Sequence, residues 1–120
     1  PGTLFLIERG TLPNRGDLVA FRWQLNGPYP QGSLFVKRLI GIPGSIVSAR
    51  SRDFFVDGDP VGRAKERART GELLEIGAVG TIPDGHYYVA GEHPDSLDSR
   101  CRLTGWVARQ QIVGTAHRIF

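Results

Sequence analysis

Glycine and proline interrupt this chain of 120 residues at short intervals along nearly its whole length. There are 16 glycines and 8 prolines, and a helix interior loses about 1 kcal/mol for each glycine and about 3 kcal/mol for each proline. Several form turn signals, such as Asn26-Gly27-Pro28 and Asp57-Gly58, and Asn-Gly and Asp-Gly tolerate the positive φ of hairpin turns. The composition therefore excludes a helical bundle and favours strands joined by tight turns.

The runs between these turn signals have the apolar, β-branched and aromatic character of strands. Their spacing predicts a mostly β fold of coiled antiparallel sheets or a partial barrel, with at most one or two short helices. Residues 62–71, GRAKERARTG, break the pattern, and we expect a helical turn or a loop there. We expect strands over residues 3–8, 17–23, 34–41, 45–49, 53–56, 86–90 and 112–120.

Length and composition narrow the class of protein. We expect residues 1–120 to form one domain. The net charge of +3 is too weak to indicate nucleic-acid binding, and residues 62–71 carry no interleaved aromatic for base stacking. The apolar runs are far shorter than the roughly 20 residues of a membrane helix. Three scattered histidines and the single Cys101 lack metal-ligand spacing, so we expect no metal or other cofactor.

A lysine lies in the middle of the most apolar run, LFVKRLI over residues 34–40. Strand side chains alternate between faces, so Lys37 shares a face with Phe35 and Leu39, and Arg38 lies on the other. A cation on an apolar face costs several kcal/mol unless it is paired, reaches water or loses its proton; Arg38 cannot lose one. Desolvation lowers a lysine pKa, which would make Lys37 a general base for a serine hydroxyl. A charged gatekeeper at a sheet edge is the alternative.

A polar loop, GEHPDSLDSR over residues 91–100, follows the expected strand 86–90. Asp98 and Arg100 point the same way in an extended segment, so we expect a bidentate ion pair that fixes the loop. Ser96 could then offer its hydroxyl to a nearby amine, and an ordinary surface turn is the alternative. A Ser–His–Asp triad built on His93 is rejected, because residues so close in one loop rarely reach triad geometry.

Together these segments resemble the type I signal peptidases, the serine–lysine family that removes signal peptides outside the cytoplasmic membrane. The lysine block, FVKRLIGIPG over residues 35–44, is the specific match. RGDLVAF over residues 15–21 resembles the family's R-G-D-hydrophobic-V-x-F strand, and residues 91–100 resemble its last block, G-D-N-x-x-x-S-x-D-S-R. IVGTA over residues 112–116 fits the closing I-V-G-x-A strand. The resemblance spans almost the whole chain and implies the family's coiled β fold.

The resemblance also implies an activity and roles for four residues. The activity is serine endopeptidase cleavage of an extended segment of an exported precursor by a Ser–Lys dyad. Lys37 falls on the general base, and Ser96 falls on the serine that orients the lysine amine. Asp98 and Arg100 fall on the pair that braces the loop. Asp95 matches a carboxylate of the same block, to which we assign no role.

Within the family, residues 94–98 and the short connection between the lysine block and the last block resemble the conjugative-transfer peptidases of the TraF type, which mature a pilin subunit. Residues 64–74 also resemble their R-x-G-x-x-L stretch. These features favour a TraF-type peptidase over a housekeeping signal peptidase. Two further alternatives are a self-cleaving protein of the LexA-like kind and a non-catalytic β binding domain with the same fold.

The chain departs from the family pattern at two places. The family's nucleophilic serine lies in an S-x-P motif ahead of the first strand. If Pro1 is that proline, the serine lies two residues upstream, and we expect residues 1–120 alone to be inactive. Ser33 is about 13 Å from Lys37 at 3.3 Å per residue and cannot replace it. Where the family has R-Y-x-G, residues 100–105 read RCRLTG, which changes the packing beside the site.

The resemblance further implies a membrane anchor ahead of Pro1. Such an anchor would hold the catalytic domain at the periplasmic face of the bacterial inner membrane. We expect peptide and membrane partners of this kind and no nucleic acid.

Overall fold

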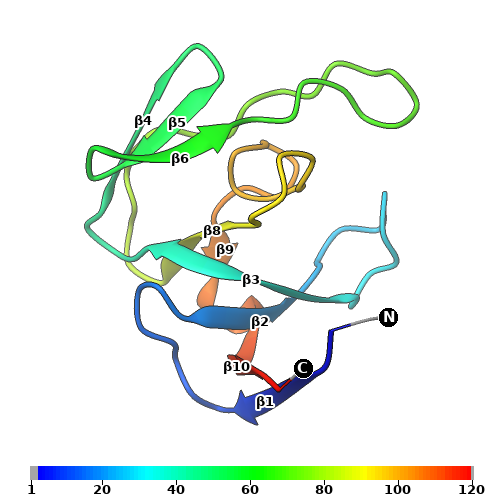
Figure 1. Cartoon of the computed structure of the whole chain (residues 1–120), viewed down its shortest axis with the longest axis vertical. Helices are drawn as coiled ribbons and strands as arrows, with labels where there is room; N and C mark the ends of the chain where they lie inside the picture. Colours follow the sequence, from blue (N-terminus) through cyan, green and yellow to red (C-terminus); the bar gives the residue numbers. More distant parts are fainter. Residues whose placement is uncertain (1–2, 120) are drawn as a thin grey trace.

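The computed structural model describes residues 3–119, which form two antiparallel β-sheets (Figure 1). The six-stranded sheet has the order β1-β10-β2-β3-β8-β9, and the four-stranded sheet has the order β6-β5-β4-β7. The mostly β fold with antiparallel sheets that the sequence predicts is confirmed. No helix within residues 3–119 has the length and apolar character that crossing a bilayer requires. The elements are β1 (Phe5–Arg9), β2 (Leu18–Arg22), β3 (Leu34–Gly41), β4 (Ile46–Arg50), β5 (Asp53–Val56), β6 (Asp59–Arg63), β7 (Gly80–Thr81), β8 (His86–Ala90), β9 (Val107–Ala108), the 3-10 helix η1 (Arg109–Gln111) and β10 (Ile112–Arg118).

Each of the seven expected strands is present, within one or two residues at each end. The expectation about the S-x-P motif concerns Pro1, and the expected end of the last strand is Phe120. Both residues lie outside the described residues. Three short strands were not predicted. β6 contains Pro60 and Gly62, residues depleted in strands, and it is tolerated because it lies at a sheet edge. β7 and β9 have two residues each, too few for a pattern.

The segment over residues 62–71 forms no helix. β6 extends into it as far as Arg63, and beyond that the chain makes a loop with one isolated antiparallel bridge between Arg67 and Leu73. Ala64 is buried in an apolar core, and this tertiary contact outweighs the helix-forming composition of the segment. We call residues 64–74 the basic arm.

Two apolar cores lie on opposite faces of β3 and β8. Alternate residues of β8 serve the two cores, so Tyr87 joins one and Tyr88 the other. β3 does the same with Leu39 and Ile40. This double burial explains why the sequence of β8 is apolar on both faces. The first core contains Val19, Phe21, Leu39, Tyr87, Val89 and Val107, and the second contains Val47, Phe54, Val56, Ala64, Ile82 and Tyr88.

Gly41 lies where β3 enters the second core, and that core leaves no room for a side chain. A Cβ at this position would lie 2.8 Å from Ile82 Cδ1 and 3.0 Å from Tyr88 Cβ. We expect Gly41→Ala to lower the free energy of unfolding by about 1–3 kcal/mol through overpacking. Urea denaturation measures this change.

A second substitution tests the cause of that loss. Ile82→Val removes the Cδ1 atom that the new methyl group would meet, so in the Gly41→Ala background it should restore part of the stability. Ser48→Ala, at an exposed position of β4, is the neutral control. Additive effects of the two core substitutions would contradict the steric explanation.

Candidate active site

The middle strand of the large sheet, β3, has a free backbone edge over its first four residues. β2 pairs with one edge from Leu34 to Arg38. On the other edge, β8 pairs only from Arg38 onward, because it ends at Ala90 opposite Arg38. Residues 34–37 therefore have no partner strand on this edge among the described residues. Lys37 is the last residue of this free edge.

Lys37 meets Ser96 where the chain leaves β8. The Lys37 Nζ atom donates a hydrogen bond of 2.6 Å to Ser96 Oγ. The same Nζ lies 6.0 Å from the centre of the Phe35 ring, on the face that the alternation of β3 predicts. Gly91 packs against this contact, because a Cβ there would collide with Ser96 Oγ and lie 3.3 Å from Lys37 Nζ. The absence of a side chain at Gly91 is what lets the amine and the hydroxyl meet.

Burial is the main influence on the charge of Lys37. Desolvation lowers the pKa of the Lys37 amine below its ordinary value, since the ammonium loses water in this position. The negative charge of Asp98 opposes this effect by stabilising the ammonium, and the positive charge of Arg100 adds to it. The neutral amine is the form that can accept a proton. At a given pH it is therefore more populated in Lys37 than in an exposed lysine.

Asp98 and Arg100 form a buried bidentate ion pair under the loop. Arg100 Nε donates to Asp98 Oδ1 at 2.9 Å, and Arg100 Nη2 donates to Asp98 Oδ2 at 2.7 Å. The side chain of Asp98 is 0% exposed and that of Arg100 is 4% exposed. The hydrogen bonds that Arg100 donates to Asp98 are the main cause that raises the pKa of Arg100. The two side chains meet as expected, but the expectation of an extended segment is wrong.

A tight turn, and not extended backbone, brings these two side chains together. The Cys101 amide donates to the Asp98 carbonyl at 2.9 Å, and the Arg100 amide donates to Asp98 Oδ1 at 3.1 Å. Asp98 Oδ2 also accepts the Gly91 amide at 2.8 Å. The carboxylate thus organises both the turn and the glycine that faces Lys37. Local side-chain bonding of this kind is a common reason for Asp in turns.

Ser99 was not singled out from the sequence, although it anchors the loop to β8. Its Oγ accepts the Val89 amide at 2.9 Å, and its own amide donates to the Val89 carbonyl at 3.0 Å. His93, rejected as a triad member, accepts the Asp95 amide at its Nδ1. The close approach of Gly91 was also missed, because no sequence signal marks which glycine will lie against a side chain.

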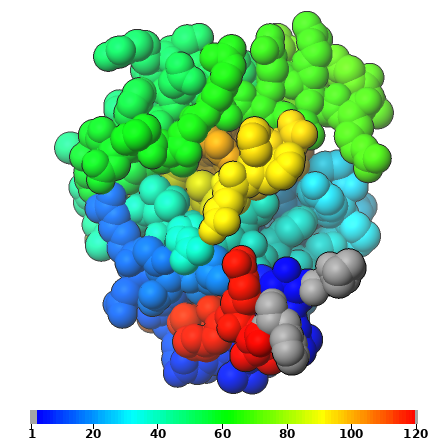
Figure 2. Space-filling model, viewed as in Figure 1, coloured from blue at the N-terminus to red at the C-terminus, as the bar shows by residue number. Residues whose placement is uncertain are grey.

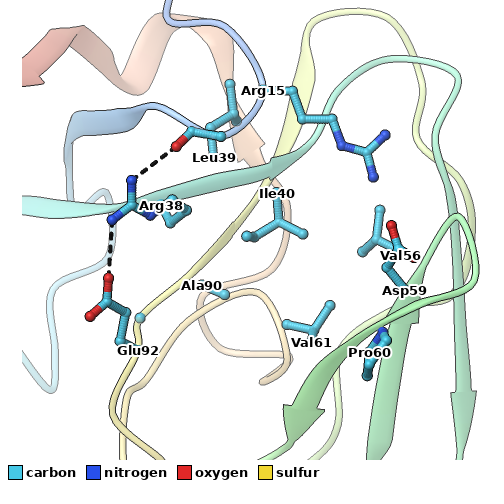
Figure 3. A pocket seen from close by; sticks show the side chains of 12 residues that line it. Arg15, Arg38, Leu39, Ile40, Val56, Asp59, Pro60, Val61, Ala90 and Glu92 are labelled. Carbon is cyan, nitrogen blue, oxygen red and sulfur yellow. Dashed lines mark hydrogen bonds and ion pairs between the residues drawn. The ribbon is translucent and has the colours of Figure 1, made fainter.

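The opposite face of β3 carries Arg38, which was expected to be paired or to reach water and is paired. Its guanidinium donates to Glu92 Oε1 at 3.0 Å and to the Gly16 carbonyl at 2.9 Å. Figure 3 shows this residue at the rim of a pocket of about 430 Å³ with an apolar floor that includes Ile40 and Val61. Gly91, where a Cβ would lie 3.3 Å from Lys37 Nζ, also lines this pocket.

These features define what the arrangement can do. An amine with a lowered pKa, held by a hydroxyl, can accept a proton from a nucleophile. The free edge beside it can pair with an extended peptide. Within residues 3–119 no group of three or more His, Cys, Asp and Glu side chains is arranged to hold a metal ion.

Comparison with known proteins agrees with the sequence resemblance. The model of the family described as "Signal peptidase, peptidase S26" matches residues 2–120. Signal peptidase I T of Bacillus subtilis is 31% identical over 114 residues, covering 88% of this chain and 56% of the relative. Signal peptidase I S of the same organism is 32% identical over 117 residues, covering 89% of this chain and 59% of the relative. The chain thus spans a little more than half the length of these two relatives.

The solved structures give the same answer for the fold. The crystal structure of a signal peptidase I from Enterococcus faecalis V583 superposes with a TM-score of 0.55 at 27% identity. The match covers 88% of this chain and 97% of that one. A family match over nearly the whole chain and a shared fold lead to one conclusion: this chain belongs to the signal peptidase family, peptidase S26.

Proposed function

We propose that this chain carries the general base and the substrate-binding edge of a serine endopeptidase that cleaves exported precursor proteins. One observation carries the proposal: Lys37 Nζ lies 2.6 Å from Ser96 Oγ at the end of the free edge of β3. A desolvated amine, a hydroxyl that orients it and an unpaired strand edge are the parts that a serine–lysine peptidase needs.

The nucleophile in this proposal is a serine in a segment ahead of Pro1, as the family pattern implies. Neutral Lys37 takes the proton of that hydroxyl while Ser96 holds the amine in place. The serine oxygen attacks the scissile carbonyl, and a backbone N–H near the serine stabilises the oxyanion. When the peptide C–N bond breaks, Lys37 returns the proton to the leaving amine. Lys37 then takes a proton from water, whose oxygen attacks the acyl-serine ester, and it returns this proton to the serine oxygen as the ester bond breaks.

The substrate in this proposal is an extended peptide that pairs with residues 34–37 of β3. Main-chain hydrogen bonds to a free strand edge give affinity without reading side chains. The pocket that Ala90 and Gly91 line begins where this edge ends at Arg38, and in this proposal small side chains before the cut enter it. A membrane anchor ahead of Pro1 would place the site at the periplasmic face of the inner membrane.

Within the family we propose the conjugative-transfer type, with a pilin precursor as the substrate. Residues 94–98 and the short connection between β3 and β8 support it, because residues 42–85 form only the small four-stranded sheet and the basic arm. The housekeeping assignment has the support of the Bacillus relatives. Cleavage of a conjugative pilin precursor in preference to general signal-sequence precursors would support the first; equal cleavage would support the second.

We expect Lys37→Met to abolish cleavage in a protein that includes the residues ahead of Pro1. A general base contributes about 10²–10⁴ in rate, so activity should fall at least that far in a fluorogenic peptide assay. In the unsubstituted protein, kcat/KM should rise with pH and level off below the ordinary pKa of lysine, since burial lowers that of Lys37. Arg50→Met, on the exposed end of β4, is the control.

The same variant separates catalysis from folding. With a lowered pKa in the native state, Lys37 binds fewer protons there than in the unfolded chain between its native and ordinary pKa values. Its contribution to stability therefore rises with pH through that window. Lys37→Met should remove this rise while the protein stays folded at neutral pH. Surviving cleavage by the folded variant would overturn the assignment of the base, and binding without cleavage by the unsubstituted protein would favour a non-catalytic domain.

Ser96→Ala tests whether Ser96 orients the amine or is itself attacked. If it only orients Lys37, we expect a loss of about 10–100-fold, the size typical of residues that position another group, with part of the activity retained. Mass spectrometry after an acylating substrate then finds the acyl group on the upstream serine. An acyl group on Ser96, with a loss as complete as that of Lys37→Met, would contradict the proposed dyad.

Gly91→Ala tests the close contact beside the dyad. Its methyl group would collide with Ser96 Oγ and crowd Lys37 Nζ, and misplacing a catalytic group by about 1 Å costs around 10²-fold in rate. We expect kcat to fall by that order while tryptophan fluorescence shows a folded protein. In the Ser96→Gly background the same substitution should cost less, because both the Oγ and the Cβ atoms that the methyl group meets are gone; an equal cost in both backgrounds would argue against the contact.

A further inference from the structure

A second pocket, of about 480 Å³, lies beside the Lys37–Ser96 contact. Leu97, the neighbour of Ser96, lines one side of it, and Tyr29 lines another. Tyr29 packs edge-on against Phe35 with the ring centres 4.9 Å apart, and Phe35 shares its face of β3 with Lys37. The pocket therefore lies next to the proposed catalytic site, because its lining includes the sequence neighbour of Ser96 and a ring that packs against Phe35. Its other apolar lining residues are Pro28, Ala68, Leu74 and Leu103.

The basic arm closes the outer side of this pocket. Figure 2 shows the arm, in green, and the loop over residues 24–33, in light blue, on either side of the yellow segment around residues 91–97. Lys65 and Arg69 extend from the arm into the pocket lining. Among the hydrogen bonds and ion pairs of residues 3–119, none involves the side chain of either cation. Two positive groups thus border the pocket, and among the described residues neither forms an ion pair with a carboxylate.

Two carboxylates also line the pocket and limit where a negative ligand can lie. Glu72 accepts a hydrogen bond of 2.9 Å from the Thr70 hydroxyl within the arm. Asp95 lies on the opposite wall, on the loop that carries Ser96. The arm carries three cations, Lys65, Arg67 and Arg69, against the two carboxylates Glu66 and Glu72. A bound anion is therefore favoured near Lys65 and Arg69 and disfavoured near Asp95, and this polarity gives a peptide one preferred orientation.

We propose that this pocket recognises the substrate peptide close to the scissile bond, taking a large apolar side chain against Tyr29 and Leu97 and a neighbouring acidic side chain against Lys65 and Arg69. The proposal rests on the proposed peptidase function. Phe35, which contacts the pocket through Tyr29, lies about 6.6 Å along β3 from Lys37 at 3.3 Å per residue. The side chains that the pocket recognises therefore lie within about four residues of the cut bond. The pocket thus selects a peptide by the size and negative charge of its side chains. The free edge of β3, in contrast, binds only the main chain of the peptide.

Peptide cleavage by the protein that includes the residues ahead of Pro1 tests the proposal. Quenched fluorescent peptides carry Glu, Gln or Lys at each of four positions on either side of the cut. We expect one position at which Glu raises kcat/KM about tenfold over Lys, with a preference that weakens as salt is added. The double variant Lys65→Glu/Arg69→Glu should invert this preference.

Matched variants separate the pocket from general charge effects. Arg50→Glu/Arg109→Glu changes net charge equally at two exposed residues outside the pocket and should keep the preference for Glu. Leu103→Ser should lower the preference for Leu over Ala next to the acidic position. A flat profile in the unsubstituted protein, or a preference that survives the double reversal, overturns the proposal.

Failure of the peptidase function itself has a different result. If none of the peptides is cleaved, fluorescence anisotropy of the same labelled peptides with the Lys37→Met protein still measures recognition by the pocket. Tighter binding of the Glu peptide than of the Lys peptide, inverted by Lys65→Glu/Arg69→Glu, supports the pocket while the peptidase proposal fails. Equal binding of both peptides overturns the pocket as well.

Discussion

The geometry of the site depends on one buried ion pair. Asp98 and Arg100 are both almost fully excluded from water. Such a buried pair is favourable only when hydrogen bonds replace the water that the two charged groups have lost. Here the carboxylate accepts two backbone amides as well as the guanidinium. Arg100 also reaches the Arg63 carbonyl of β6 and the Gly91 carbonyl, each at 3.4 Å. The pair therefore connects the small sheet, the loop and the end of β8, and this connection holds Ser96 against Lys37.

The fold follows from the sequence more closely than the site does. Turn residues and alternation locate the seven main strands, because both signals are local. β3 was even predicted with its two faces correct, since its side chains alternate around two cores. The basic arm shows the limit of such signals: its composition is helical, but burial of Ala64 beside Tyr88 and Ile82 decides its conformation. A tertiary contact of this kind cannot be predicted from the local sequence, because the contacting residues are distant in the chain.

The site residues could be listed from the sequence, but their contacts could not be derived from it. The spacing of Asp98 and Arg100 indicated a pair, yet the turn that makes it depends on backbone hydrogen bonds to Asp98. Lys37 and Ser96 are far apart in the chain, and family resemblance alone placed them together. Gly91 lies close to Ser96 and Lys37, and Ser99 forms two hydrogen bonds with the backbone of Val89. Such roles depend on distances in space, which periodicity does not encode.

The ion pair and the lysine also set a balance of charge. Burial favours the neutral amine of Lys37, while the nearby Asp98 carboxylate favours the ammonium. Arg100 limits the second effect, because its own positive charge lowers the pKa of Lys37 and offsets part of the field of Asp98. An unpaired carboxylate at the same place would stabilise the ammonium and weaken the base. Pairing Asp98 with a guanidinium that cannot lose its proton therefore has two consequences: it ties the loop to neighbouring backbone, and it allows a carboxylate to lie near a lysine that must be neutral in the proposed mechanism.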